Sequence, residues 1–278
     1  MNAPADNTSP PPPISVLCAV HNGEAFIEES VRSILTQTFK GFELVLLNDG
    51  ATDRTPQILD GLAREDSRIR VFHRENRGLT RTLSEGLTLC RGALIARQDD
   101  DDISLPARLA LQKAFMDAHP EIAITGCRYR SIDVEGRIIG NENVPLSSAA
   151  IKRGLLTHNV IAHSGAMFRR EAVLKLGGYD ETYTTAQDYD LWCRAALHHE
   201  LANLPSPLLH RRKHPHQIGV KATASQRANR NKIRNAYRLA VIHGENTVAL
   251  PFSVRALARL YEVFDFTKPE AAPAGEKK

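Results

Sequence analysis

Residues 92–106, GALIARQDDDDISLP, join a short apolar strand to a run of four aspartates. The first six residues are apolar or small apart from Arg97, which is typical of a strand buried in a parallel sheet. Four adjacent carboxylates repel one another, so a folded site that contains residues 99–102 needs a cation or full exposure to water. An isolated acidic run is usually a solvated loop, but one at the end of a buried strand indicates a binding site.

The aspartate run also indicates which cation the site would take. Carboxylate oxygens favour the hard cations Mg²⁺ and Mn²⁺, which usually bridge to the phosphates of a substrate. We therefore expect Mn²⁺ or Mg²⁺ as a cofactor that neutralises a departing diphosphate.

Three more strand–helix units are predicted upstream of the aspartates. Strands are predicted over Ile14–Val20, 42–47 and 69–73, and helices over 24–37, 55–66 and 78–90. Strands that alternate with helices indicate an α/β fold with a mostly parallel, doubly wound sheet. Ligands of such sheets bind beyond the carboxyl ends of the strands, and His21 and Asp49 follow two of these ends.

The downstream half is less regular. Helices are predicted over 106–118, 149–156, 170–176 and 189–198, a hairpin over 122–132 and 137–139, and two C-terminal helices over 225–243 and 252–265. We expect one domain over residues 14–219, followed by a helical segment over 220–266. The Pro-rich leader, 1–13, and the polar tail, 267–278, are expected to be disordered.

The composition favours a globular protein with a mild excess of basic residues. The formal net charge is +4, and basic side chains crowd residues 211–238. Such a stretch is usually a solvated helix face, although it also suits an anionic membrane surface. The four cysteines form no CxxC pair, which indicates free thiols in a reducing compartment. With no signal-peptide pattern and no membrane-spanning apolar run, we expect a cytoplasmic protein; peripheral contact with the inner membrane face and the oligomeric state stay open.

Four further polar residues are candidates for chemistry, each with a structural alternative. Asp49 follows an apolar strand and either accepts hydrogen bonds from a ribose or base or caps the next turn. Asp188 precedes an apolar helix and is either a general base or a helix cap. His163 and His214 suit a metal or a phosphate, but a single histidine is more often a packing or surface residue.

Other chemistries lack their motifs. The sequence contains no GxGxxG after the first strand, no GxxxxGK[ST] and no GxSxG. The aromatic content is 6%, and no nucleic-acid recognition motif is present. We therefore expect no nucleic-acid partner.

Seven ordered segments of the chain resemble the motifs of the family-2 inverting glycosyltransferases. They include FELVLLNDGATDRT, ENRGL, GALIARQDDDDISLPARL, HSGAMFRRE, GGYDETYTTAQDYDLWCRA and HRRKHPHQI, besides the first strand and helix, and they cover about residues 14–219. The resemblance implies the nucleotide-sugar-binding GT-A fold, a divalent cation and single displacement with inversion. It also implies a nucleotide-sugar donor, with a UDP-sugar as the first choice, and a glycan or lipid-linked acceptor in surface polysaccharide synthesis.

The resemblance also implies a role for each matching residue. Asp188 would be the base, Asp101 a metal ligand, and His214 a residue near metal or diphosphate. Asp102 would support the acidic loop. The residues that would bind the donor are Ala19, His21, Glu24, Asp49, Asn76, Asp99, Asp100 and Arg212.

Three departures from the family pattern bear on these roles. Ala19 replaces a frequent proline and His21 a frequent tyrosine, which alters a stacking contact with the base. Gln187 stands where glutamate is common, next to the retained Asp188. Two alternatives stay open: a nucleotidyltransferase, which also uses an α/β sheet and acidic metal ligands, and a non-catalytic module that binds a nucleotide-sugar or glycan, which Gln187 favours.

Overall fold

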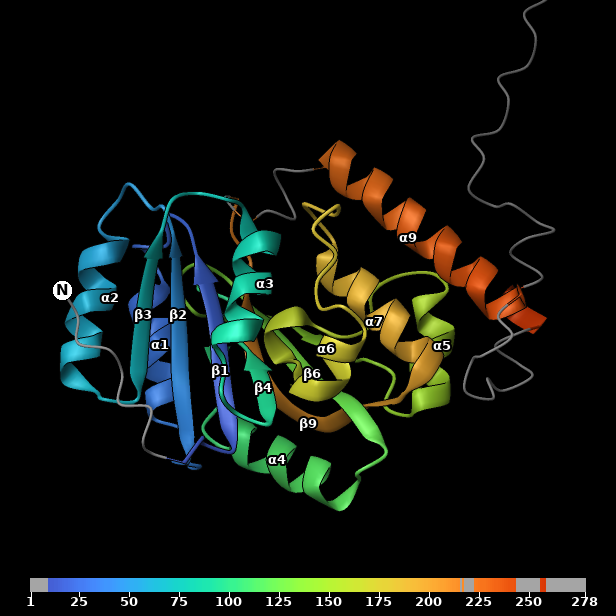
Figure 1. Ribbon diagram of the computed structural model, residues 1–278, viewed down its shortest axis with the longest axis horizontal. Coiled ribbons are helices and arrows are strands. Elements are labelled where there is room, and N and C mark those ends of the chain that lie inside the picture. Colours follow the sequence, from blue (N-terminus) through green and yellow to red (C-terminus); the bar gives the residue numbers. More distant parts are fainter. Residues whose placement is uncertain (1–9, 216, 218–222, 244–255, 259–278) are drawn as a thin grey trace, which may run out of the picture.

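A computed structural model describes residues 10–215, 217, 223–243 and 256–258 (Figure 1). Its first half is a parallel sheet in the order β3-β2-β1-β4. The strands are β1 (Ile14–Val20), β2 (Phe42–Asp49), β3 (Ile69–Arg74) and β4 (Leu94–Arg97). Because β1 pairs in parallel with both β2 and β4, the strand order reverses at β1, and this reversal creates the ligand position of a doubly wound sheet.

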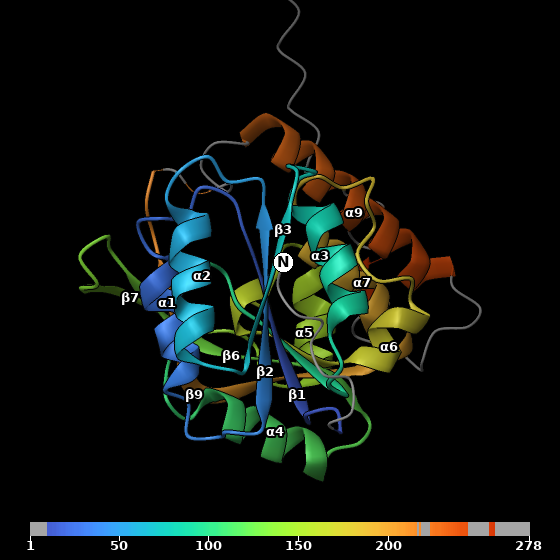
Figure 2. The same cartoon turned by 60° about the vertical axis from the view of Figure 1, so that its left-hand side comes forward.

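Helices cover both faces of this parallel half (Figures 1 and 2). They are α1 (Ile27–Leu35), α2 (Thr55–Glu65) and α3 (Leu79–Leu89). Alternate residues of β1 point to opposite faces: Val16 and Cys18 pack with apolar residues of α1 and α2, whereas Leu17 packs with α3. All seven residues of β1 are buried; six of them are apolar, and the exception, Ser15, donates its hydroxyl hydrogen to Glu43 Oε1.

The second half of the sheet is mixed. The remaining strands are β5 (Ile103–Ser104), β6 (Ile122–Ile132), β7 (Ile138–Glu142), β8 (Met167–Arg169) and β9 (Glu200–Arg212). Strand β8 runs antiparallel between β4 and β6, and β9 runs parallel to β6. The α/β fold class with a mostly parallel, doubly wound first half is confirmed, while β5, β8 and β9 were not predicted.

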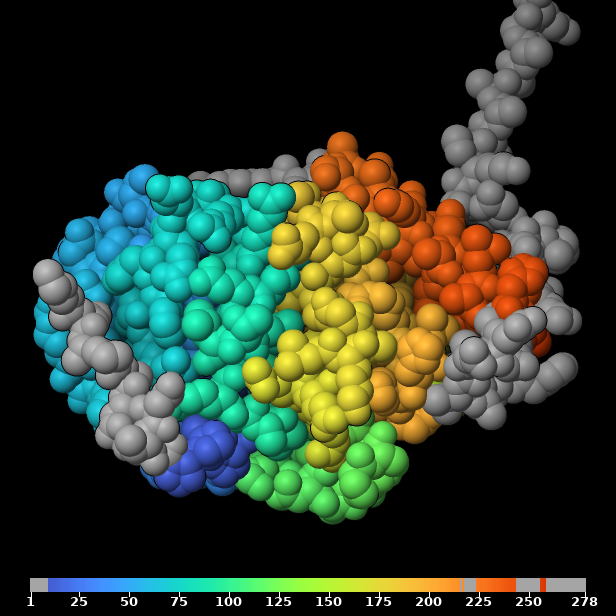
Figure 3. Space-filling model, in the orientation of Figure 1, coloured from blue at the N-terminus to red at the C-terminus, as the bar shows by residue number. Residues whose placement is uncertain are grey.

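The other helices pack around this mixed half. They are α4 (Arg108–Ala118), α5 (Ser148–Leu155), the 3-10 turn η1 (His163–Gly165), α6 (Arg170–Lys175), α7 (Gln187–His198) and α9 (Thr223–His243). Ile233, Tyr237 and Val241 of α9 are buried in the same core cluster as Trp192 of α7. In Figure 3, α9, coloured orange to red, accordingly lies along the yellow segment that contains α6 and α7.

Several expectations fall beyond the described residues. The leader over 1–13 is described only from residue 10, and the helix over 252–265 only at residues 256–258, which are helical. The tail over 267–278 lies outside the described residues, as does the boundary at 219–220. Among the helices that are described, none combines the length and the apolar character that crossing a bilayer requires.

Candidate active site

A cleft of about 730 Å³ opens at the carboxyl ends of β1, β2 and β4. Nine of the eleven predicted site residues line it, and they come from segments that span most of the folded chain. They are Ala19, His21, Asp49, Asn76, Asp99, Asp100, Asp101, Asp188 and His214. Glu24 and Arg212 are not among the residues that line the cleft.

Asp99 is fixed at the floor of the cleft by the strand that precedes it. Its carboxylate accepts a hydrogen bond of 2.6 Å from the buried guanidinium of Arg97, and its backbone N–H donates to Ser164 Oγ. Burial would raise the pKa of the Asp99 carboxyl and is the largest single influence on it, but the positive charges of Arg97, Arg211 and Arg108 act against burial, and the pKa is held below its usual range. Asp99 is therefore an anion.

The rest of the acidic loop carries charge that the protein compensates only in part. Burial and the carboxylates of Asp101 and Asp99 raise the pKa of Asp100 to about 8, and the same causes raise the pKa of Asp102 well above its usual range. Carboxylate oxygens of Asp99, Asp101 and Asp102 lie within 4.8 Å of one another. These oxygens are spaced as ligands of one divalent cation, and its charge would relieve their repulsion, so the donor set fits Mg²⁺ or Mn²⁺.

Two side chains from beyond β9 meet Asp101. His214 Nε2 lies 2.9 Å from Asp101 Oδ2, and Gln217 Nε2 donates to the same oxygen over 3.1 Å. An imidazole and a carboxylate at this distance match the predicted metal pair, although their role as ligands stays a prediction. Gln217 was not singled out in the sequence.

Arg212 holds the acidic loop from behind and does not face the cleft. Its side chain is buried, its backbone N–H donates to Asp102 Oδ1, and its guanidinium donates to the Asp101 carbonyl oxygen. The same guanidinium donates to the carbonyl oxygens of Asp133 and Val134 and pairs with Glu29 of α1. With its donors engaged in this way, Arg212 supports the loop, and the geometry gives no support to the predicted contact with substrate.

Glu24 also acts within the protein. Its carboxylate accepts from the backbone N–H of Arg54, while its own N–H donates to Asp53 Oδ2. These two bonds join the loop after β1 to the start of α2. Glu24 is therefore placed to hold two loops together, away from the predicted pocket for base and ribose.

The other end of the cleft is built by Asp49, His21 and Asn76. Both carboxylate oxygens of Asp49 accept backbone N–H groups at the start of α3, from Arg77 at 2.8 Å and Gly78 at 3.0 Å. His21 Nδ1 lies 2.8 Å from the Asp49 carbonyl oxygen, so this nitrogen carries the proton, and Nε2 is left to accept from the amide groups of Asn22 at 3.3 Å and Asn76 at 3.4 Å. Asp49 thus acts as a cap, and it still lines the cleft.

Asp188 lies in the first turn of α7. Ala186, two residues before Asp188, has a left-handed φ of 62° that turns the chain into the helix. Burial raises the pKa of the Asp188 carboxyl, and the nearby carboxylate of Asp99 acts in the same direction. A carboxylate with a raised pKa at the edge of a cleft is suited to accept a proton.

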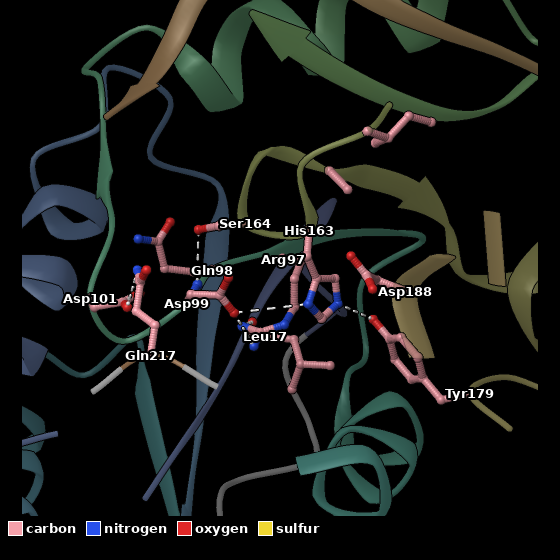
Figure 4. A network of polar contacts seen from close by, with 12 residues as sticks. Leu17, Arg97, Gln98, Asp99, Asp101, His163, Ser164, Tyr179, Asp188 and Gln217 are labelled. Atoms are coloured by element: carbon pink, nitrogen blue, oxygen red, sulfur yellow. Dashed lines mark hydrogen bonds and ion pairs between the residues drawn. The ribbon is translucent and has the colours of Figure 1, made fainter. Parts of the chain in front are cut away.

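His163 lies between the acidic loop and Asp188 (Figure 4). Its Nε2 is 2.9 Å from the Tyr179 hydroxyl, and its Nδ1 is 3.9 Å from Asp99 Oδ1. Burial, together with the charge of Arg97, lowers the pKa of His163 to about 3, so the imidazole is neutral. The sequence gave this histidine as a metal or phosphate contact or as a packing residue, and the contacts seen here are with Tyr179 and Asp99.

Arg211 and Phe26 also line the cleft and were not predicted. Arg211 lies directly before Arg212 in a basic run, where alternate residues of β9 point in opposite directions. Arg211 faces the cleft and Arg212 is buried. This difference follows from their places on β9, a strand that was not predicted.

The family comparison agrees with this architecture. The sequence model of Glycosyl transferase family 2 matches residues 15–177, more than half of the chain. The chain therefore belongs to glycosyltransferase family 2.

Two relatives with named functions align with about two thirds of the chain. The O-antigen biosynthesis glycosyltransferase WbnJ of Escherichia coli is 34% identical over 182 residues, which is 65% of this chain and 70% of that protein. The amylovoran biosynthesis glycosyltransferase AmsE of Erwinia amylovora is 32% identical over 199 residues, 70% of this chain and 74% of that protein.

Solved structures show the same GT-A fold at low sequence identity. Residues 1–349 of TarS from S. aureus, in complex with UDP-GlcNAc, superpose with a TM-score of 0.72 at 20% identity, over 91% of this chain and 73% of that chain. The mannosyltransferase PcManGT from Pyrobaculum calidifontis, in complex with GDP-Man and Mn²⁺, has a TM-score of 0.62 at 18% identity, over 92% and 72%.

Proposed function

We propose that the protein transfers a sugar, with inversion, from a UDP-sugar to a hydroxyl group of a glycan or lipid-linked acceptor. The observation that carries this proposal is the convergence of Asp49, the acidic loop and Asp188 on one cleft. Asp49 suits the nucleoside of a donor, the acidic loop suits its diphosphate, and Asp188 suits the hydroxyl of an acceptor. A nucleotide-sugar donor beside a hydroxyl acceptor matches this order.

The proposed donor site has a nucleoside end and a phosphate end. Asn76 and His21 face the cleft at the nucleoside end, and Asp99 is assigned to the ribose. Asp101 and His214 would hold Mn²⁺ or Mg²⁺ at the phosphate end. A bound divalent cation would supply positive charge to the diphosphate as it leaves.

Asp188 is assigned the role of general base. The carboxylate takes the proton of the acceptor hydroxyl while that oxygen attacks the anomeric carbon on the face opposite the diphosphate. The C–O bond to the diphosphate breaks as the new glycosidic bond forms, so one displacement inverts the anomeric centre. Gln187, which replaces a frequent glutamate, leaves Asp188 as the carboxylate for this step.

The comparisons support a UDP-sugar and a polysaccharide product without deciding either. WbnJ and AmsE are named for O-antigen and amylovoran biosynthesis, and TarS was solved with UDP-GlcNAc. PcManGT was solved with GDP-Man, so the fold itself accepts more than one base. We take UDP as the first donor to test.

A donor panel tests the proposal directly. The protein is incubated with UDP- and GDP-sugars, Mn²⁺ and glycan acceptors, and release of nucleoside diphosphate is measured. Release from one donor is expected, and Asp188→Asn should keep donor binding but abolish transfer. Release of pyrophosphate would instead indicate a nucleotidyltransferase, and binding without any release would indicate a non-catalytic module.

We further propose that residues 14–219 form the catalytic domain and that the basic helix α9, near residues 225–243, contacts an anionic membrane at its inner face, near a lipid-linked acceptor. Arg227, Arg230 and Lys232 of α9 are exposed, and each basic residue near an anionic surface contributes about 1 kcal/mol. Sedimentation with vesicles that contain phosphatidylserine tests this contact. Arg227→Glu with Arg230→Glu should release the protein, and equal sedimentation of both forms would rule the contact out.

A further inference from the structure

Asn159 connects the candidate base to the segment between α5 and η1. Its Nδ2 donates a hydrogen bond of 2.7 Å to Asp188 Oδ2. Its Oδ1 accepts from the backbone N–H of Ile161 over 3.1 Å. Because the oxygen of the amide is held by a donor, the NH₂ group must face Asp188, and the orientation of the amide is fixed.

The structure assigns Asn159 as a positioning residue that orients the Asp188 carboxylate for proton transfer. This inference rests on the proposed function, in which Asp188 is the base. The hydrogen bond to Oδ2, together with one from the backbone N–H of Tyr189, restricts rotation of the carboxylate that is to receive the proton of the acceptor. A base that is held in one orientation keeps the reacting atoms close to the geometry of the transition state.

The segment that carries Asn159 also contacts the donor side of the cleft. Ser164 Oγ accepts from the backbone N–H of Asp99, and His163 Nε2 contacts the Tyr179 hydroxyl (Figure 4). One stretch of six residues, 159–164, therefore touches both the base and the first aspartate of the acidic loop. The spacing between the base and the donor site depends on this stretch.

Asn159 also acts on the charge of Asp188. A donor to the carboxylate favours the anion, and it opposes the burial that raises the pKa of Asp188. The titratable and charged groups that act on Asp188 from the neighbouring elements are Asp99, Arg211, Tyr179 and Cys193. Loss of the Asn159 donor leaves these groups in place, so the pKa should rise further.

Two variants test the role of this amide. Asn159→Ala removes both hydrogen bonds, whereas Asn159→Asp keeps an acceptor for Ile161 N–H and replaces the donor with a second carboxylate. We expect kcat to fall about tenfold or more in each, with the donor KM within about twofold of wild type. In a plot of kcat against pH, the pH at which kcat falls on the acid side (the acidic limb) should rise by about one unit in Asn159→Ala. It should rise further in Asn159→Asp because like charges repel.

Asn229→Ala is the matched control. Asn229 Nδ2 donates to the carbonyl oxygen and the hydroxyl of Thr185, so it holds the chain just before α7 without touching Asp188. This variant should leave the acidic limb where it is. The inference is overturned if Asn159→Asp keeps the wild-type limb and kcat, or if Asn229→Ala shifts the limb as far as Asn159→Ala does.

The Asp188→Asn variant distinguishes failure of the proposed base from failure of the positioning role of Asn159. If Asp188→Asn turns over normally, the proposed base is wrong and the role of Asn159 fails with it. If Asp188→Asn is inactive while both Asn159 variants behave as wild type, only the positioning role fails.

Discussion

His214 Nε2 and Asp101 Oδ2 are 2.9 Å apart although 113 residues separate them in the sequence. The contact joins the segment after β9 to the loop after β4, two strands that are separated in the sheet by β8 and β6. It brings to the acidic loop an imidazole, the proposed nitrogen ligand, that no local pattern supplies. The predicted cation site therefore depends on both halves of the sheet.

His214→Ala and Asp101→Asn should each weaken Mn²⁺-dependent donor binding by about tenfold or more, because each removes one proposed ligand. Thermal shift with UDP, in the presence and absence of Mn²⁺, measures the effect. His119→Ala, at an exposed histidine paired with Glu121, should behave as wild type. Unchanged Mn²⁺ dependence in both site variants would contradict the assignment.

The turnover rate should fall on the acid side at a pH above the ordinary aspartate pKa of about 3.9. Burial raises the pKa of Asp188, so the ionised base is lost as the pH falls through this raised value, and kcat drops tenfold per unit below it. The profile is measured at saturating donor and Mn²⁺, so that occupancy of the donor site stays constant. A profile that stays flat down to pH 4 would argue against Asp188 as the base.

Arg212→Ala should lower the free energy of unfolding by about 3 kcal/mol or more, since it leaves the carbonyl oxygens of Asp101, Asp133 and Val134 without their donor and Glu29 without its cation. Arg212→Lys should recover little of this loss, because an ammonium cannot reproduce the planar set of donors. Urea unfolding provides the measurement. Arg137→Ala, at an exposed ion pair, serves as the comparison and should change stability far less.

Gly23→Ala should destabilise the protein by about 1–3 kcal/mol and weaken donor binding. A Cβ at Gly23 would lie 2.4 Å from Asp100 Oδ2 and 2.5 Å from Val20 Cγ2, so the acidic loop would have to move. Gly61→Ala, on α2 with open space around the added methyl group, should stabilise the protein by about 0.5–1 kcal/mol. Equal stability of the two variants in urea would show that the close approach at Gly23 is unimportant.

The parallel half of the fold was predictable because each strand is a short apolar run that ends in a polar loop. The β1 prediction, Ile14–Val20, matches the structure residue for residue. The missed strands lack such a signal. Strand β9 contains Pro205 and Pro207, which normally exclude a strand interior, and its pairing with β6 shifts register opposite them; β5 and β8 are two and three residues long.

The candidate site was predictable where strand ends or family motifs marked it, as for Asp49, Asp101 and Asp188. Asn159 and Arg211 escaped because a single polar residue in a loop, or in a basic run, has no local signature. For Arg212, a sequence motif identified the residue but not the direction of its side chain. A motif located it correctly in the sequence, but only the packing of its side chain shows that it faces the back of the loop.

The hydrogen bond between the Arg212 N–H and Asp102 has a consequence for biosynthesis. Its two ends are 110 residues apart, so the ribosome completes the four aspartates long before it makes the backbone N–H group from which Asp102 accepts. Strands β1 to β4 can pair as they emerge, because their contacts lie between residues 14 and 97. The acidic loop must wait for β9, so it reaches its final hydrogen bonds later in synthesis than the parallel half of the sheet does.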